Sequence, residues 1–319
     1  MKSMAIIIPY FGKLPNYFTI FLESARENST IDFFVFTDND IEIKKDDNIH
    51  IIKTTFDEIV KRAQNCFDFK ISLNNYYKIC DYKPVYGQMF FEYIKDYDFW
   101  GYCDIDIVLG DIRKFITDDI LLKYDRVMTN GHFSLYRNCP KVNKWYCTLT
   151  TKGCQNYKDV YTNEKNCSYD EWAAHAGNGI SEIIKRNNIP QFGERQEEKF
   201  YADLDILNYS FVFKICYGNF DKKDGIYFAY SNGKLYIRSK KDNSLNNEIL
   251  YVHYQKRKIE VSSYNTNHFF LIPPGKIVSK ESDVVFRNKF YGFKYKWLWS
   301  RLILKVKNIV DIKSKDNQR

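Results

Sequence analysis

The stretch FWGYCDIDIVLGD, residues 99–111, places two carboxylates one residue apart at the end of an aromatic and apolar run. Carboxylates as close as those of Asp104 and Asp106 repel each other unless a positive charge lies between them. Residues 99–103 have the apolar character of a buried strand, and a helix over residues 83–98 is expected to lead into it. On a strand, both aspartate side chains would leave from one face. The stretch predicts a strand whose end presents two carboxylates to a shared cation.

The segments before this stretch alternate between expected strands and expected helices. Short apolar runs at residues 4–11, 31–40 and 48–55 indicate buried strands, and residues 16–29 and 56–67 have apolar side chains at helical spacing. This alternation is typical of a parallel sheet with helices on both faces. We predict an open α/β fold, in which ligands bind at the carboxyl ends of the strands.

The segments after this stretch are expected to be mixed. A helix is predicted over residues 111–124, followed by a strand and its loop over residues 125–138. Residues 169–188 have a helical pattern that two glycines interrupt. Short β segments follow, with a hairpin turn at residues 231–233 and a late strand within residues 248–258.

The distribution of charge limits the classes of function. The chain has 319 residues and a formal net charge of +8, from 48 Lys/Arg and 40 Asp/Glu. Residues 286–319 contain ten of the basic and two of the acidic residues, so that residues 1–285 are neutral overall. A protein that binds nucleic acid more often has positive charge across a broad face. We predict no nucleic-acid partner.

The cysteines and the apolar runs indicate where the protein works. None of the eight cysteines forms a CxxC pair. The first apolar run is too short for the core of a signal peptide, and Pro9 interrupts it. No stretch approaches the roughly 18 apolar residues that a membrane span requires. We predict a cytoplasmic protein with reduced thiols.

The paired aspartates are suited to a hard cation, because Mn²⁺ or Mg²⁺ would relieve their repulsion and hold a substrate diphosphate. The alternative is two solvated aspartates in a turn. Asp111, which follows a glycine, is expected to cap the next helix. Asp203 and Asp205 form a second Asp-x-Asp pattern, which is a reserve candidate for the metal site, but they follow no long buried run and are predicted to be surface residues.

Residues 78–116 and the segment GHFSLYRN, residues 131–138, carry a resemblance to a known group of enzymes. They resemble GT-A-type glycosyltransferases, which transfer a sugar from a nucleotide-sugar and use a DxD motif to bind metal and diphosphate. More closely, they are similar to a bacterial family encoded among capsule and surface-polysaccharide genes. The resemblance covers about residues 4–275. It implies a GT-A-like fold with Asp104 and Asp106 at the DxD positions, a UDP-sugar or related donor, and a glycan or lipid-linked acceptor.

The resemblance also implies roles for residues that bind the donor. His253, in LYVHYQKRK, would be the third metal ligand, and Lys256 or, alternatively, Lys258 would contact the diphosphate. The alternative for His253 is a partly buried histidine in an aromatic strand. Lys83 would pair with the donor's phosphates, although a solvated lysine beside a proline is equally consistent with the sequence.

The ends of the first two expected strands would hold the base and the ribose. Pro9, Tyr10 and Phe11 follow the first strand, and the ring of Tyr10 would stack on the base. Asp38, after the second strand, would accept hydrogen bonds, but an aspartate at a strand end is often only a turn residue.

Three further residues are candidates for contact with the reacting sugars. His132 would touch the donor sugar or the acceptor, or be a structural histidine. Asp170 and Glu171 are the catalytic candidates, because an inverting transferase needs a carboxylate that deprotonates the acceptor hydroxyl. The alternative is an acidic first turn of a helix. Whether the reaction inverts or retains stereochemistry stays open.

Residues 286–319 are predicted to form a basic amphipathic helix, separate from a transferase domain over residues 1–285. Eight apolar side chains between residues 295 and 310 fall within one arc of about 140° on a helix. Tryptophans and flanking Lys/Arg suit a helix that lies on an anionic membrane surface. The expected location is the inner face of the cell membrane. The alternative is a helix packed on the protein itself.

Two other functions are consistent with the same residues. A nucleotidyltransferase would also use paired aspartates and a metal, but it would normally have a glycine-rich basic loop near the first strand. The third interpretation is a non-catalytic module that binds glycan or membrane with a transferase-like fold.

Overall fold

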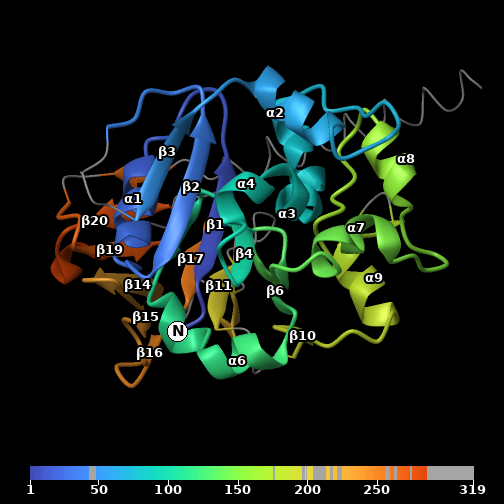
Figure 1. Cartoon of the computed structure of the whole chain (residues 1–319). Coiled ribbons are helices and arrows are strands. Elements are labelled where there is room, and N and C mark those ends of the chain that lie inside the picture. Colours follow the sequence, from blue (N-terminus) through green and yellow to red (C-terminus); the bar gives the residue numbers. More distant parts are fainter. Residues whose placement is uncertain are drawn as a thin grey trace, which may run out of the picture.

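A computed structural model of the chain (Figure 1) describes most of the residues up to 285. The described residues are 1–42, 48–174, 177–195, 198, 200–203, 213–215, 218–220, 225–255, 259–261, 264–273 and 275–285. The predictions for Lys256 and Lys258, for Asp205 and for the tail at residues 286–319 lie outside them. Among the described helices, none has the length and apolar character needed to cross a membrane.

The centre of the fold is a seven-stranded sheet with the order β10-β6-β7-β4-β1-β2-β3 (Figure 1). Its strands are β1 (Met4–Pro9), β2 (Ile31–Thr37), β3 (Ile49–Lys53), β4 (Phe99–Cys103), β6 (Arg126–Asn130), β7 (Phe133–Arg137) and β10 (Gln191–Phe192). Strand β1 pairs in parallel with β2 and β4, and β3 and β10 also pair in parallel with their neighbours. Strand β7 runs antiparallel between β4 and β6. The predicted mostly parallel α/β sheet is confirmed.

Helices cover both faces of this sheet, as the alternating pattern predicted. Because successive side chains of a strand point to opposite faces, β1 contributes to two separate cores. Ala5 and Ile7 pack in the core that includes α2 (Phe56–Gln64) and α9 (Ile180–Arg186). Met4, Ile6 and Ile8 pack in the core that includes α1 (Phe18–Arg26).

The helix expected over residues 83–98 is replaced by three short elements. A 3-10 helix, η1, spans Tyr76–Val85, and two single-turn helices follow, α3 (Tyr86–Met89) and α4 (Phe91–Ile94). Phe90, with φ −119° and ψ 21°, leaves the helical region between α3 and α4. The prediction of one long helix before β4 is therefore wrong.

The helix expected over residues 111–124 is also divided, into α5 (Ile112–Phe115) and α6 (Asp118–Lys123). Ile116 leaves the helical region with φ −113° and ψ 82°, and the Thr117 side chain then caps α6. The predicted role of Asp111 is confirmed, because its carboxylate accepts a hydrogen bond from the Lys114 amide at the start of α5, at 3.1 Å.

Two further segments differ from the expectation. Residues 125–138 form a hairpin of two strands, β6 and β7, with a bulge between Val127 and Asn130. Residues 169–188 are helical only from Ile180, in α9. Before it, β8 (Ala173–Ala174) and β9 (Gly177–Asn178) form a short antiparallel pair.

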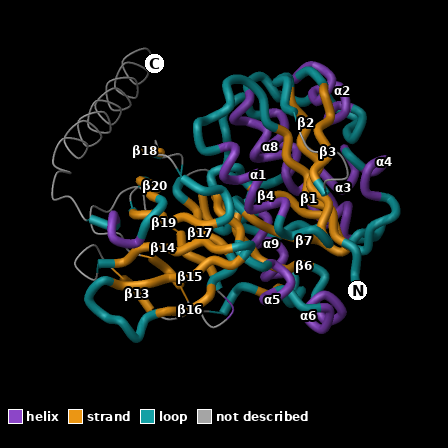
Figure 2. Tube along the Cα trace, turned by 90° about the vertical axis from the view of Figure 1, so that its left-hand side faces the viewer, coloured by secondary structure: helices purple, strands orange, loops and turns teal. Residues whose placement is uncertain are grey.

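The C-terminal part of the described chain adds further sheets beside the mostly parallel one, and two of them are larger than the rest (Figure 2). A small sheet joins β11 (Tyr201–Asp203), β17 (Tyr251–His253) and β5 (Ile107–Leu109). A mostly antiparallel sheet contains β16 (Asn246–Glu248), β15 (Lys234–Ser239), β14 (Ile226–Ser231), β19 (His268–Ile272), β20 (Lys276–Val278) and β18 (Glu260–Val261). The predicted hairpin turn is confirmed, since Asn232 and Gly233 have φ values of 45° and 78° between β14 and β15.

The remaining described elements are short. They are η2 (Val142–Lys144), α7 (Trp145–Thr148), α8 (Tyr157–Thr162), β12 (Phe213–Ile215), β13 (Gly218–Phe220) and η5 (Glu281–Asp283).

Candidate active site

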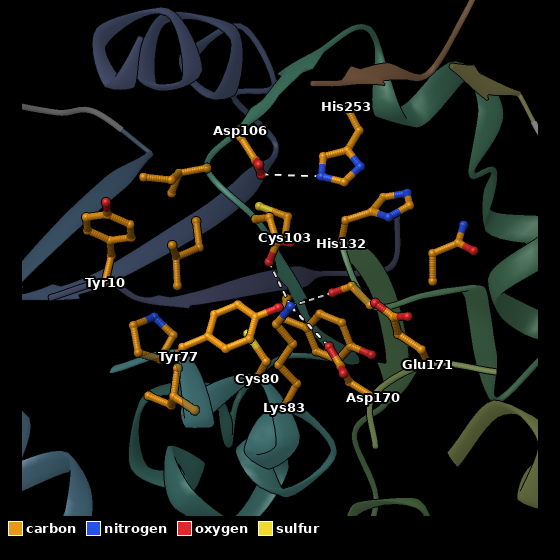
Figure 3. Close-up of a pocket in the computed structure, with 18 of the residues that line it drawn as sticks. Tyr10, Tyr77, Cys80, Lys83, Cys103, Asp106, His132, Asp170, Glu171 and His253 are labelled. Atoms are coloured by element: carbon orange, nitrogen blue, oxygen red, sulfur yellow. Dashed lines mark hydrogen bonds and ion pairs between the residues drawn. The ribbon is translucent and has the colours of Figure 1, made fainter. Parts of the chain in front are cut away.

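A cavity of about 850 Å³ opens at the carboxyl ends of β1 and β4 (Figure 3). Ten of the residues chosen from the sequence line it: Pro9, Tyr10, Phe11, Lys83, Asp104, Asp106, His132, Asp170, Glu171 and His253. In Figure 3, Tyr10 and Tyr77 lie on one side of the cavity, and His253, His132, Asp170 and Glu171 lie on the other. The carboxyl edge of the sheet, where the sequence predicts that a ligand binds, therefore contains a cavity lined by several carboxylates.

Asp104 and Asp106 reach the cavity from the loop between β4 and β5, because β4 ends at Cys103. The expectation that both leave one face of a strand is wrong. Instead, Asp104 accepts a hydrogen bond from Lys83 at 2.7 Å, and Asp106 lies 3.4 Å from the Nε2 atom of His253. Each carboxylate thus faces a different basic side chain.

His253 reaches Asp106 through the pairing of β17 with its two neighbours. The register sets His253 opposite Ile107 of β5 and opposite Asp203 of β11. Its Nδ1–H donates to the Asp203 carboxylate at 2.8 Å, so that Nε2 is the nitrogen that faces Asp106. Burial alone would lower the pKa of His253, but the carboxylates of Asp106 and Asp203 raise it to about 10.

Asp203 is a candidate site residue that the sequence interpretation placed at the surface. Its side chain is 30% exposed and lines the cavity, so the prediction of a surface residue is wrong. It accepts hydrogen bonds from His253 and, at 2.8 Å, from Gln255. Although burial acts in the other direction, these contacts hold the pKa of Asp203 well below its usual range. The signal is not local, because the short strand β11 pairs with a strand 50 residues further along the chain.

The donor atoms of this region fit a divalent metal ion. Asp104, Asp106 and His253 offer ligand atoms that all lie within 4.8 Å of one another. His132, Asp203 and His253 form a second such group. Because Nδ1–H of His253 donates to Asp203, the nitrogen that belongs to the first group is Nε2, which faces Asp106. Two carboxylates and one imidazole are ligands that divalent metal ions accept in proteins, and a carboxylate behind a ligating histidine orients the ring.

Lys83 is buried between carboxylates and is not a solvated lysine. Its ammonium donates to Asp104 at 2.7 Å and to the carbonyl oxygen of Gly131 at 2.6 Å, and it lies 3.2 Å from the Asp170 carboxylate. Burial alone would lower the pKa of Lys83, but Asp104 and Asp170 hold it well above its usual range. An ammonium has three hydrogens, and each has a protein oxygen within reach. Contact with a phosphate would therefore require Lys83 to give up one of these partners.

Asp170 and Glu171 lie in a loop ahead of β8 and not in the first turn of a helix. Asp170 is buried, and burial raises its pKa to about 7 even though Lys83 acts in the opposite direction. Glu171 has exposed surface, but loss of hydration around its carboxylate raises its pKa as well. A methyl group on Gly131 would lie 2.7 Å from the Asp170 carboxylate and 2.8 Å from Glu171, so this close approach requires a glycine.

His132 is a buried residue with protein partners. Its Nε2 atom lies 2.9 Å from the Tyr251 hydroxyl, and its ring stacks on the ring of His253. Burial, together with the positive charge of His253, lowers the pKa of His132 to about 4. These contacts agree with a structural histidine, and its contact with a sugar stays a prediction.

The other end of the cavity is aromatic. Tyr10 lines it, while Phe11 is buried against Phe56, with ring centroids 5.5 Å apart. Asp38 is exposed and is absent from the described lining of the cavity. Its carboxylate instead accepts a hydrogen bond from the Gly12 amide at 3.1 Å, so its visible role is to hold the turn after β1.

Comparison with solved structures gives partial similarities to the galactosyltransferase LgtC. A crystal structure of LgtC with donor and acceptor sugar analogues is 17% identical, over 45% of this chain and 59% of that one, with a TM-score of 0.28. An active-site mutant of LgtC is 15% identical, over 50% of this chain and 69% of that one, with a TM-score of 0.30. The chain thus spans 59% of the length of the first of these structures. None of the curated proteins matches the chain.

A family of proteins of unknown function has a model that matches residues 6–281. The matched range contains the parallel sheet from Ile6 onward, both aspartates of the Asp-x-Asp motif and His253. The chain therefore belongs to the DUF6625 family, a family of unknown function.

Proposed function

We propose that this protein is a metal-dependent glycosyltransferase that moves a sugar from a nucleotide-sugar to a glycan or lipid-linked acceptor in the synthesis of surface polysaccharide. The observation that carries the proposal is the convergence of Asp104, Asp106 and His253 in the wall of the large cavity, with ligand atoms within 4.8 Å of one another. A cavity of about 850 Å³ is within the range for small-molecule sites. The resemblance of residues 78–138 to GT-A-type enzymes supports a sugar as the transferred group.

Asp104, Asp106 and the Nε2 atom of His253 would hold Mn²⁺ or Mg²⁺. When bound, the cation offsets the charge that develops on the leaving nucleoside diphosphate. Asp203 accepts the hydrogen bond from Nδ1–H of His253, so Nε2 is the nitrogen that would give up its proton and face the metal. The chain thereby supplies two negative charges and one neutral donor.

The two acidic residues on the same side of the cavity as His253 (Figure 3) are suited to different tasks. The Asp170 carboxylate is fixed by Lys83 and buried, so it would accept hydrogen bonds from hydroxyl groups of the donor sugar. The Glu171 carboxylate is more exposed and would take the proton of the acceptor hydroxyl. Its raised pKa favours such a proton acceptor at neutral pH.

The aromatic end of the cavity would receive the nucleotide. Tyr10 lies beside the end of β1, and its ring offers a face on which a uracil base would stack. Pro9 and Phe11 would shape the same wall. Lys256, outside the described residues, stays the proposed contact for the diphosphate. The basic tail would hold the enzyme at the inner membrane surface, where a lipid-linked acceptor lies.

The test is a panel of nucleotide-sugars with Mn²⁺, read as released nucleoside diphosphate. We expect one donor to be hydrolysed or transferred by the wild type and not by Asp106→Asn. Asp119→Asn changes an exposed acid on α6 and is the matched control. Equal release by the wild type and Asp106→Asn would remove the metal role. Release of pyrophosphate from nucleoside triphosphates would indicate a nucleotidyltransferase, and calorimetry that shows no Mn²⁺-dependent binding of UDP would rule out the proposed donor.

A further inference from the structure

The 3-10 helix η1 presents three different faces, because its residues repeat every three positions. One face packs in the core: Ile79, Tyr82 and Val85, of which Ile79 also reaches the cavity. A second lines the cavity: Tyr77, Cys80 and Lys83. The third contains Lys78 and Asp81, which face the segment that precedes the acidic loop. Runs of 3-10 helix longer than about four residues are uncommon, and η1 has 10.

Lys78 and Asp81 form an ion pair from which water is excluded. Their charged groups are 2.8 Å apart, and both side chains are 0% exposed. The Lys78 ammonium also donates to the carbonyl oxygens of Val160, at 2.9 Å, and Lys165, at 2.7 Å. All three of its hydrogens therefore have partners. A buried pair of this kind often contributes little net stability.

Asp81 holds the backbone of the segment that leads to the catalytic candidates. Its carboxylate accepts hydrogen bonds from the amides of Cys167, at 2.8 Å, and Tyr169, at 2.9 Å. The second of these amides is one residue before Asp170. Five residues after Lys78 on the same helix, Lys83 lies 3.2 Å from the Asp170 carboxylate. The helix thus holds this segment at two points, by its backbone before Asp170 and by the Asp170 side chain itself.

We propose that the Lys78–Asp81 pair is a positioning device that fixes Asp170 and Glu171 at the cavity. Its consequence for catalysis rests on the proposed glycosyltransferase function. Neither residue lines the cavity in the described part of the chain, so the pair acts through the segment and not on the substrate. Asp81 is the anchor, and Lys78 neutralises its charge while it ties the same segment through Lys165.

Two variants test this proposal. Asp81→Asn keeps the size of the side chain, but it leaves Lys78 buried without its counter-ion and is expected to lower the free energy of unfolding. Lys78→Met combined with Asp81→Leu removes both charges and so leaves no unpaired buried charge, while the amides of Cys167 and Tyr169 lose their acceptor. Asp159→Asn, an exposed acid on the neighbouring helix α8, is the matched control.

The first measurement is hydrogen exchange of the Ile180 amide, which donates to the Tyr169 carbonyl oxygen at 2.7 Å. This reporter belongs to none of the altered residues. We expect exchange at least about 10-fold faster in the double variant, since local opening of the segment exposes this amide. Exchange at the wild-type rate in the folded double variant would overturn the proposal, whether or not a transferase activity is found.

The second measurement is the kinetics of sugar transfer by the same proteins. We expect kcat to fall by about 10-fold to 100-fold, as misplacement of reacting groups by about 1 Å does. The affinity for Mn²⁺ should stay unchanged, because Asp104, Asp106 and His253 are untouched. Faster exchange of Ile180 with unchanged kcat would overturn the catalytic role. If the wild type itself transfers no sugar, the proposed function fails, and the exchange measurement still decides whether the pair holds the segment.

Discussion

His132 lies flat against His253, with ring centroids 4.3 Å apart and ring planes inclined by 22°. The two rings differ in charge in the metal-free protein. Burial and the charge of His253 lower the pKa of His132 to about 4. Burial acts in the same direction on His253, but the carboxylates of Asp106 and Asp203 raise the pKa of His253 to about 10. A neutral ring thus supports the proposed metal ligand from one side, and Asp203 holds it from another.

We expect His132→Ala to weaken the binding of Mn²⁺ by about 10-fold, because the imidazole of His253 loses the surface that fixes its orientation. His132→Phe keeps an aromatic ring at this position and should retain most of the affinity. Calorimetric titration with Mn²⁺ measures both variants. Equal affinities for the wild type and His132→Ala would show that the stacking is irrelevant to the metal.

Asp203→Ala should lower the affinity for Mn²⁺ by about 10-fold to 100-fold, the usual cost of losing a carboxylate behind a ligating histidine. Asp203→Asn still accepts the hydrogen bond from Nδ1 of His253 and should have a smaller effect. The measurement is Mn²⁺ binding in the absence of nucleotide. If both variants bind the metal as the wild type does, then Asp203 does not orient His253.

Gly131→Ala should lower kcat without a change in metal affinity. The added methyl group would lie 2.7 Å from the Asp170 carboxylate and 2.8 Å from Glu171, so that both acids must move. A displacement of about 1 Å corresponds to a loss of about 100-fold in rate. Steady-state kinetics and Mn²⁺ titration of one preparation separate the two effects. Loss of metal binding in step with kcat would contradict this separation.

The stability of the metal-free protein should depend on the ionisation of Asp170. Burial raises the pKa of Asp170 to about 7 in the folded protein, whereas an unfolded chain has the ordinary value of about 4. The folded state therefore binds this proton more tightly, and the contribution of Asp170 to the free energy of unfolding falls as the pH rises between these values.

Urea unfolding of the wild type and of Asp170→Asn across this pH range measures the contribution. We expect the free energy of unfolding of Asp170→Asn, relative to that of the wild type, to increase as the pH rises, because the amide cannot ionise. Asp119→Asn, which alters an exposed acid, should follow the wild type at every pH. A constant difference between Asp170→Asn and the wild type would mean that Asp170 does not titrate in this range.

The parts of the fold that local patterns determine could be predicted from the sequence. Strand β4 and the position of Asp104 just after it follow from the apolar run at residues 99–103. The turn at Asn232 and Gly233 follows from the backbone freedom that these residue types have. In these cases the residues that determine the structure are neighbours in the chain.

The errors occur where tertiary contacts outweigh local patterns. Residues 83–98 have helical spacing, but η1 ends at Val85 and only single turns follow it. Asp203 was assigned to the surface, because its burial depends on a strand pairing with β17 that no short window contains. The partners of Lys83 come from three separate segments of the chain, so its burial could not be predicted from the residues next to it in the sequence.

The placement of β17 between β5 and β11 has a consequence for the synthesis of the protein. Both aspartates of the proposed metal site leave the ribosome long before His253 does, and Asp203 emerges 50 residues before its partner. A nascent chain that ends before β17 contains the carboxylates without the imidazole. A nascent chain would then bind Mn²⁺ tightly only after translation has passed residue 253. Tight binding of Mn²⁺ would therefore indicate that the chain has been synthesised through β17.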